Sequence, residues 1–308
     1  MLNTQSAAPV CTAPTVRGAV RSVWSAQALL GEGTLWSVRE QALYWVDILG
    51  HQLHCYHSAS QKCDSWPFDE EISAVAERAH APGLLLTLGH DFALFDPETS
   101  HLQRLHRPEP TLTGNRFNDG KCDAQGRFWA GTMDFACSAP TGALYCYGGG
   151  SHCTRMHGNI AVTNGPTWSL DGRTMYFNDT VRGQVLAFAF EPNTGALGAA
   201  RQWLQLEADD GYPDGMTTDA AGRIWISHWG AGCVSCHDPV SAAELLRIHL
   251  PTSHITNCAF GGADLRTLFI TSACNGLSTQ QLLEQPLAGA LFCVDMDSPG
   301  LPAHYFSG

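Results

Sequence analysis

Long apolar runs and basic residues are scarce in this sequence. No apolar run approaches the roughly 20 residues that cross a bilayer, and the first twenty residues lack the basic and then apolar regions of a secretory signal. Lysine and arginine number 17 against 29 aspartates and glutamates, so the formal net charge is −12. Nucleic acid and anionic membrane surfaces would repel such a chain. We therefore expect a cytoplasmic protein with a small-molecule partner, no nucleic acid and no membrane.

Cysteine and helical periodicity are also limited. The 12 cysteines are about 4% of the 308 residues, below the about 8–10% of disulfide scaffolds, so we expect reduced thiols in strands. Only residues 241–246 and 279–284 have short patterns that favour helices, both on connections. With 44% hydrophobic residues the chain can still bury a sizeable core.

One pattern recurs along the sequence: a turn with aspartate and usually glycine, then arginine, then an apolar and aromatic strand. Two similar segments occupy residues 40–47 and 81–87, which makes six units. A repeat of about 40 to 50 residues with several short strands is typical of a β-propeller blade. The four clear copies begin 48, 48 and 45 residues apart, at Asp123, Asp171, Asp219 and Asp264.

The repeat predicts an all-β fold, a six-bladed β-propeller with a central metal-containing channel. Residues 20–308 would form one domain, and residues 1–19 a loosely ordered N-terminal extension. A strand within residues 20–30 would complete the last blade, because ring closure hides exposed sheet edges. A closed ring needs no partner at an edge, so we expect a monomer or a weak homo-oligomer.

Four polar residues stand just before repeated strands, and each is followed directly or nearly so by glycine. Equivalent positions in a ring point at one axis, so their oxygen atoms would meet there and favour a bound divalent cation. Ca²⁺, Mg²⁺ and Mn²⁺ suit such ligands best, with Zn²⁺ or Fe²⁺ as alternatives. Each residue could instead cap its turn, since Asn-Gly and Asp-Gly pairs are common in turns. The four residues are Glu32, Asn118, Asn164 and Asp214.

Several motifs, in this order and spacing, resemble the SMP-30/gluconolactonase/regucalcin family over roughly residues 20–306. They are GEGTLW (31–36), RFNDGK (116–121), TNGPTWSLDGRTMYFNDT (163–180), PDGM (213–216) and CAFGGADLRTLFITSA (258–273). The resemblance implies a six-bladed propeller that holds one divalent cation, and many such proteins hydrolyse sugar lactones. It also implies that Glu32, Asn164 and Asp214 are metal ligands, and that Arg116 and Asn118 contact the substrate.

One position departs from the family pattern. Some members have a substrate-contacting glutamate shortly after the strand that contains AGTM, and here Ala136 occupies that place. Asp134 is close in sequence, but its side chain would have to reach the substrate from a different position. This difference leaves the identity of the substrate open, but it does not affect the predicted metal ligands.

These residues predict a lactonase that hydrolyses an aldonolactone, such as a glucono-, arabinono-, galactono- or xylonolactone. A cation would polarise the carbonyl, Asp214 would act as the general base, and Arg116 would donate hydrogen bonds to substrate oxygens. One alternative is a non-catalytic divalent-cation (calcium) binding or regulatory protein, and another is a related hydrolase of other esters or phosphotriesters. Arg116 favours an enzyme, because a positive charge beside the cation would only weaken a simple ion buffer.

Two other motifs resemble ligand sites. Cys233, Cys236 and His237 match the C-x-x-C-H pattern of covalent haem attachment, but they fall where a blade strand is expected. His51, His54 and His57 lie at three-residue spacing, yet in a strand the middle histidine faces the other way. We therefore interpret both motifs as ordinary strands, the second at the surface.

Overall fold

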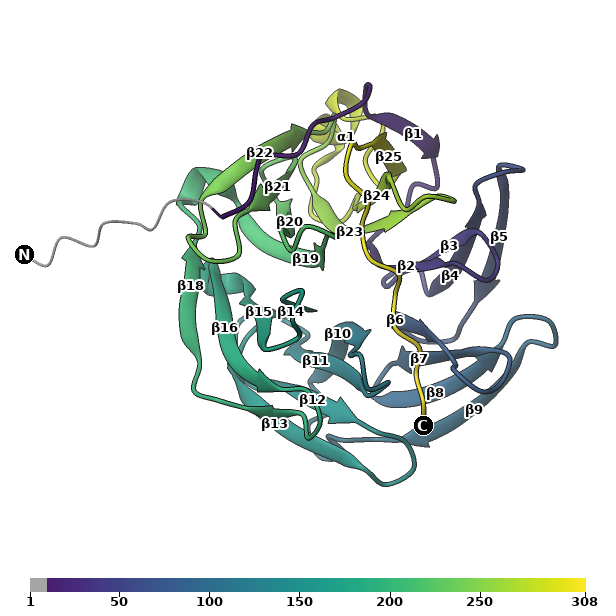
Figure 1. Ribbon diagram of the computed structural model, residues 1–308. Helices are drawn as coiled ribbons and strands as arrows, with labels where there is room; N and C mark the ends of the chain where they lie inside the picture. The colour runs from purple at the N-terminus through teal and green to yellow at the C-terminus, as the bar shows by residue number, and fades with distance from the viewer. Residues whose placement is uncertain (1–9) are drawn as a thin grey trace, which may run out of the picture.

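The computed structural model describes residues 10–308 and shows six small antiparallel sheets arranged in a ring around a central axis (Figure 1). This confirms the predicted six-bladed β-propeller. The region along this axis, between the first strands of the blades, is called the channel. Blades 1 to 3 each contain four consecutive strands, so every sheet is a simple meander with tight connections. They are β2 (Gly31–Ser37), β3 (Ala42–Asp47), β4 (Gln52–His57) and β5 (Lys62–Pro67); β6 (Ile72–Glu77), β7 (Leu84–Leu88), β8 (Asp91–Asp96) and β9 (His101–His106); and β10 (Asn115–Cys122), β11 (Phe128–Asp134), β12 (Gly142–Tyr147) and β13 (Cys153–Ile160).

Blades 4 to 6 complete the ring, and blade 4 has an additional short strand. The strands are β14 (Thr163–Trp168), β15 (Thr174–Asp179), β16 (Gln184–Glu191), β17 (Ala196–Leu197) and β18 (Arg201–Gln205); β19 (Tyr212–Thr218), β20 (Ile224–Trp229), β21 (Cys233–His237) and β22 (Glu244–His249); and β23 (Ile255–Gly261), β24 (Thr267–Ser272), β25 (Leu291–Asp295) and β1 (Arg21–Trp24). Within residues 10–308, the helical segments are α1 (Thr279–Glu284) and two 3-10 turns, Thr180–Arg182 and Ala208–Asp210.

The last blade combines the two ends of the chain. β1 pairs antiparallel with β25, so the strand predicted within residues 20–30 does complete the final sheet. Each blade then packs on its neighbours through buried apolar residues, as where Trp225 in blade 5 meets Phe260 in blade 6. Because the ring closes, each of the six interfaces between neighbouring blades buries an apolar cluster of its own.

The recurring aspartate-arginine-aromatic pattern has a physical explanation in the structure. The Asp219 carboxylate accepts hydrogen bonds from the backbone and side chain of Arg223 and from the Trp225 indole, at 2.6 to 3.0 Å. Asp123 repeats the arrangement with Arg127 and Trp129. One carboxylate thus closes the turn, neutralises a buried guanidinium and fixes the first aromatic residue of the next strand.

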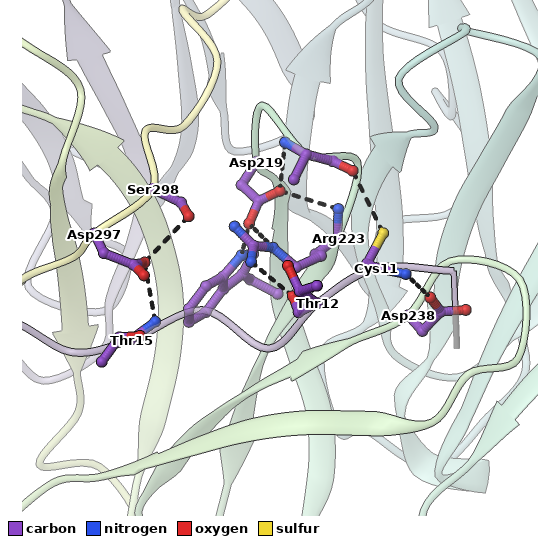
Figure 2. A network of polar contacts seen from close by, with 10 residues as sticks. Cys11, Thr12, Thr15, Asp219, Arg223, Asp238, Asp297 and Ser298 are labelled. Carbon is purple, nitrogen blue, oxygen red and sulfur yellow. Dashed lines mark hydrogen bonds and ion pairs between the residues drawn. The ribbon is translucent and has the colours of Figure 1, made fainter. Parts of the chain in front are cut away.

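The chain before β1 lies across blades 5 and 6 (Figure 2). The backbone amides of Val10 and Cys11 donate to Asp238 at 2.7 and 2.8 Å, and the amide of Thr15 donates to Asp297 at 2.9 Å. Val16 then forms an isolated bridge with Met296. Of the extension predicted over residues 1–19, residues 1–9 lie outside the described part of the chain.

The two short helix predictions had different outcomes. Residues 279–284 form α1, whose first turn is capped by Ser278. The helix predicted over residues 241–246 is wrong, because Leu246 belongs to β22 and pairs with Cys236 of β21. No helix within residues 10–308 is both long and apolar enough to cross a membrane.

The cysteine motif and two of the three histidines, His54 and His57, lie in strands as expected, whereas His51 lies in the turn before β4. Cys233, Cys236 and His237 are buried in β21, and all twelve cysteines are free thiols. His54 differs from the predicted surface strand, because its ring is buried against Trp45 and Trp24. The alternation of β4 turns this histidine into the blade interface.

Candidate active site

The predicted polar residues lie in the first half of the first strand of their blades. Glu32 is on β2, Asn118 on β10, Asn164 on β14 and Asp214 on β19. Each strand has an irregularity in its pairing at this point, for example between Glu32 and Leu35. Such bulges re-aim a side chain out of the ordinary alternation, so the same local distortion turns each polar group toward the channel.

The bulges explain the glycine that follows two of these residues. Gly33 has φ +58°, and a Cβ atom there would lie 2.9 Å from the carbonyl oxygen of Ser73. Gly165 has φ +79°. These left-handed conformations favour glycine, so the Glu-Gly and Asn-Gly pairs reflect the backbone geometry that positions Glu32 and Asn164.

Glu32 and Asp214 bring two carboxyl groups together at the channel. The pKa values of both are raised, first because burial disfavours the charged forms. The Asp119 charge adds to the shift at Glu32, and the Glu32 charge adds to the shift at Asp214. Glu32 Oε2 accepts from the Gly33 amide at 2.9 Å, whereas Asp214 Oδ1 is buried without a hydrogen-bond partner among the described residues.

Arg116, Asn118 and Asn164 form a directed chain of hydrogen bonds. Arg116 Nη1 donates to Asn118 Oδ1 at 2.8 Å, and Asn118 Nδ2 donates to Asn164 Oδ1 at 2.8 Å. Asn164 Nδ2 in turn donates to Thr180 Oγ1 at 3.0 Å. This order fixes the amide orientations, and Asn164 Oδ1 keeps one lone pair available.

The structure therefore gathers all five predicted residues in one place. Each is less than 7% exposed. Burial lowers the pKa of the Arg116 guanidinium, while nearby charges that include Glu32 and Asp214 act in the opposite direction. A buried cation and two buried acids in one channel indicate a site for charged chemistry rather than turn capping alone.

Two further residues belong to this site and were not predicted. Asn257 on β23 donates through Nδ2 to Glu32 at 2.9 Å and to Asp119 at 3.4 Å. Its Oδ1 accepts from Thr34 at 2.8 Å. Asp119 also accepts from the Gly165 amide at 3.0 Å. Asp119 directly follows Asn118 in sequence, which is a usable signal, whereas Asn257 is followed by cysteine and not by glycine.

The segment after β11 lies beside Arg116. The Phe135 ring faces the guanidinium at 5.7 Å, and Phe135 is 49% exposed. Ala136 follows it and carries no polar group. Asp134 accepts from the backbone amides of Ser138 and Ala139 at 2.9 and 2.8 Å. Asp134 thus holds its own loop and does not replace the glutamate that some family members have.

The donor set suits a divalent cation. Among residues 10–308, no group of three or more histidine, cysteine, aspartate or glutamate side chains is placed to hold a metal ion, so an ion here would need amide oxygens as well. Asp214 Oδ1 without a partner, the adjacent Glu32 carboxylate and the free lone pair of Asn164 Oδ1 supply oxygen ligands. A cation between them would relieve the carboxylate repulsion.

Comparisons with known proteins agree with this fold. The sequence profile of the SMP-30/Gluconolactonase/LRE-like region matches residues 30–274. YvrE of Bacillus subtilis (strain 168), which carries the name of a sugar lactone lactonase, is 32% identical over 92% of this chain and 96% of its own length. Regucalcin of Homo sapiens is 31% identical over 90% of this chain and 95% of its own.

A solved structure shows the same architecture. It is that of a calcium-binding protein, regucalcin, from Agrobacterium tumefaciens strain C58, with a TM-score of 0.90 and 28% sequence identity. The match covers 94% of this chain and 98% of the other. At this coverage, the two rings correspond over almost their whole length.

Proposed function

The chain belongs to the SMP-30/gluconolactonase/LRE-like family, and on that premise we propose that it is a metal-dependent lactonase that hydrolyses a sugar lactone to its aldonic acid. Family membership supports lactonase-type activity in general. The observation that carries the specific proposal is Arg116, a buried guanidinium held by Asn118 beside the Glu32 and Asp214 carboxyl groups. A protein that only stores cations gains nothing from a fixed positive charge at that point.

Glu32, Asn164 and Asp214 would hold one divalent cation through oxygen atoms. A cation bound there supplies Lewis-acid polarisation of a carbonyl group and lowers the pKa of water. The identity of the ion stays open among Ca²⁺, Zn²⁺, Mg²⁺, Mn²⁺ and Fe²⁺, because carboxylate and amide oxygens accept all of them.

The protein side chains have distinct roles in the proposed reaction. The Asp214 carboxylate accepts a proton from the attacking water, because it lies at the edge of the cation site where that water would be activated. Arg116 donates to substrate oxygens where negative charge develops. Asn118 keeps the guanidinium in place at 2.8 Å. The proton on Asp214 then passes to the ring oxygen, which leaves as a hydroxyl group of the aldonic acid.

Substrate choice depends on the segment that contains Phe135 and Ala136. Without a carboxylate at Ala136, one contact that some family members make to the sugar is missing, and the Phe135 ring lies beside Arg116 instead. We propose that an aldonolactone binds here, with glucono-, arabinono-, galactono- and xylonolactone as the candidates to compare. Ring size and stereochemistry are to be resolved by assay.

The test is proton release from these four lactones by the wild type, Asp214→Asn and Asp134→Asn. We expect the first substitution to abolish turnover and the second, which alters only the loop carboxylate, to leave it within about threefold. Full activity in Asp214→Asn would overturn the proposed base. A wild type that binds a cation but hydrolyses no lactone would support the calcium-binding alternative, and turnover of other esters or phosphotriesters alone would indicate a related hydrolase.

A further inference from the structure

A cavity lies at the opposite end of the channel from the candidate active site. Its volume is about 440 Å³, which is within the range of small-molecule pockets. Trp36 and Trp168 line it at the ends of β2 and β14, whereas Glu32 and Asn164 lie at the starts of the same strands. We call this space the lower cavity.

The C-terminal segment covers the lower cavity. Residues 301–304 line it, and the segment is held on both sides, since Gly300 bridges to Asp219 and Phe306 bridges to Arg78. Figure 1 shows this segment, in yellow, crossing the ring from blade 6 toward blade 2. Leu301 is 39% exposed, so the rim beside the segment reaches solvent and a small molecule could enter there.

Lys121 separates the lower cavity from the candidate active site. It belongs to β10 in blade 3, and its Nζ donates at 2.7 Å to the carbonyl of Met216 on β19 in blade 5. The side chain therefore crosses the channel. This is the one hydrogen bond that the Lys121 ammonium makes within residues 10–308. No carboxylate in that part of the chain forms a salt bridge with it. An ammonium has three N–H donors, so two are available.

The carboxylates near the lower cavity and near Lys121 already have hydrogen-bond partners. Asp171, on the cavity wall, accepts from the Ser169 hydroxyl and the Arg173 amide. Asp119 interacts with Lys121 by charge, but its oxygens accept from the amides of Gly120 and Gly165. Asp123, at the cavity wall, accepts from Arg127 and Trp129. The anionic groups among the described residues thus leave the partly buried Lys121 ammonium without a salt-bridge partner.

The remaining wall of the lower cavity is largely apolar. Polar side chains, among them Gln125, Thr167 and Thr218, also line it. A molecule with one carboxylate and an apolar body would match both Lys121 and the apolar part of the wall. The apolar side chains include Leu35, Trp36, Val75, Phe190, Phe260 and Leu301.

We propose that the lower cavity binds a small carboxylate with an apolar body, whose carboxylate pairs with Lys121 and whose body packs against Trp36 and Phe260. This site is separate from the proposed lactone site and does not depend on lactonase activity. Both would share one channel, with Lys121 between them.

Calorimetric titration of the purified protein with 3-phenylpropanoate tests the proposal, with neutral 3-phenylpropanamide as the matched ligand. We expect the carboxylate to bind roughly tenfold or more tightly than the amide. Lys121→Met, which keeps the length of the side chain, should remove that preference and leave amide binding unchanged. Equal binding of both ligands to the wild type, or no carboxylate binding at millimolar concentration, would overturn the proposal.

Two further variants locate the bound carboxylate even if Lys121→Met fails to fold. Leu301→Trp fills the lower cavity from the C-terminal segment, and we expect it to abolish binding of 3-phenylpropanoate. Arg116→Met alters only the candidate active site and should leave that binding unchanged. The reverse pattern, with loss in Arg116→Met and retention in Leu301→Trp, would place the probe at the active site and contradict the proposal. Circular dichroism and thermal unfolding check that each variant is folded.

Discussion

At the scale of single residues, Arg116 separates substrate chemistry from ion binding. Its guanidinium donates to Asn118 and lies close to the Glu32 and Asp214 carboxyl groups. A fixed positive charge weakens the binding of a neighbouring cation but stabilises negative charge that develops on a substrate. Removing the charge should therefore weaken catalysis but should not weaken cation binding.

We predict that Arg116→Met lowers kcat/KM for the preferred lactone by about a hundredfold or more, as for loss of an oxyanion donor. The same substitution should leave cation affinity unchanged or increase it. Steady-state proton release and calorimetric titration with the cation measure the two effects. If Arg116→Met lost cation binding together with activity, the guanidinium would be part of the ion site and its assigned role would be wrong.

Asn257 is predicted to act as a positioning residue for Glu32. Its amide donates to both Glu32 and Asp119, and Thr34 fixes its orientation. Asn257→Ala should raise the dissociation constant of the cation by about ten- to hundredfold, as found when residues behind metal ligands are removed. Thr34→Val should have a smaller effect in the same direction. Unchanged cation affinity in Asn257→Ala, measured by calorimetry, would show that Glu32 needs no such support.

At the scale of elements, the turn before each aromatic strand contributes to stability through its aspartate. Asp219 and Arg223 are at most 2% exposed, and removing one partner of a buried pair leaves an uncompensated charge. We predict that Asp219→Ala lowers the free energy of unfolding by about 3–5 kcal/mol. The equivalent Asp171→Ala in an exposed turn should cost about 1 kcal/mol or less. Urea unfolding compares the two, and equal losses would contradict the explanation.

Two buried histidines on β4 and β20 predict how stability depends on pH. Burial lowers the pKa of His54 and of His228 to about 4. In the unfolded chain both titrate near about 6.5, so between pH 6.5 and 4 the unfolded state binds more protons. Stability should therefore fall as the pH drops through this window, by at most about 3 kcal/mol for each histidine. In His54→Gln, urea unfolding should show a smaller loss of stability between pH 6.5 and 4. The same dependence of stability on pH as in the wild type would refute the lowered pKa of His54.

At the scale of the whole molecule, ring closure depends on β1. This strand pairs with β25 and hides the edge of blade 6. We predict that deletion of residues 1–25 lowers the midpoint of thermal unfolding and promotes association through the exposed β25 edge. Differential scanning calorimetry and size-exclusion chromatography measure these effects. A truncated chain that stays monomeric with an unchanged midpoint would show that closure is not needed.

Much of the architecture could be predicted because one sequence pattern recurs in most blades. The aspartate turn and aromatic strand repeat at nearly constant spacing, and Glu32, Asn164 and Asp214 each precede a glycine that serves a bulge or lies beside it. Residues 241–246 could not be assigned reliably, since a short mixed segment fits a helix or a strand until its partner strand is known. β21 is that partner.

The contacts that the sequence could not reveal all depend on closure of the ring. Asn257 meets Glu32 because the sixth blade returns beside the first, 225 positions away along the chain. Lys121 reaches Met216 only because blades 3 and 5 face one channel. Such long-range contacts leave no local pattern, so the lower cavity and the support of Glu32 became visible only in three dimensions.

The central claim is that this channel hydrolyses a sugar lactone when it holds a divalent cation. The most direct test is proton release from the aldonolactones by chelator-treated protein, with Ca²⁺, Mg²⁺, Mn²⁺, Zn²⁺ or Fe²⁺ added back singly. We predict no turnover without a cation and restored turnover with at least one ion in the wild type, but with none in Asp214→Asn. Turnover that survives complete removal of the ion, or tight ion binding without turnover of any lactone, would contradict the account.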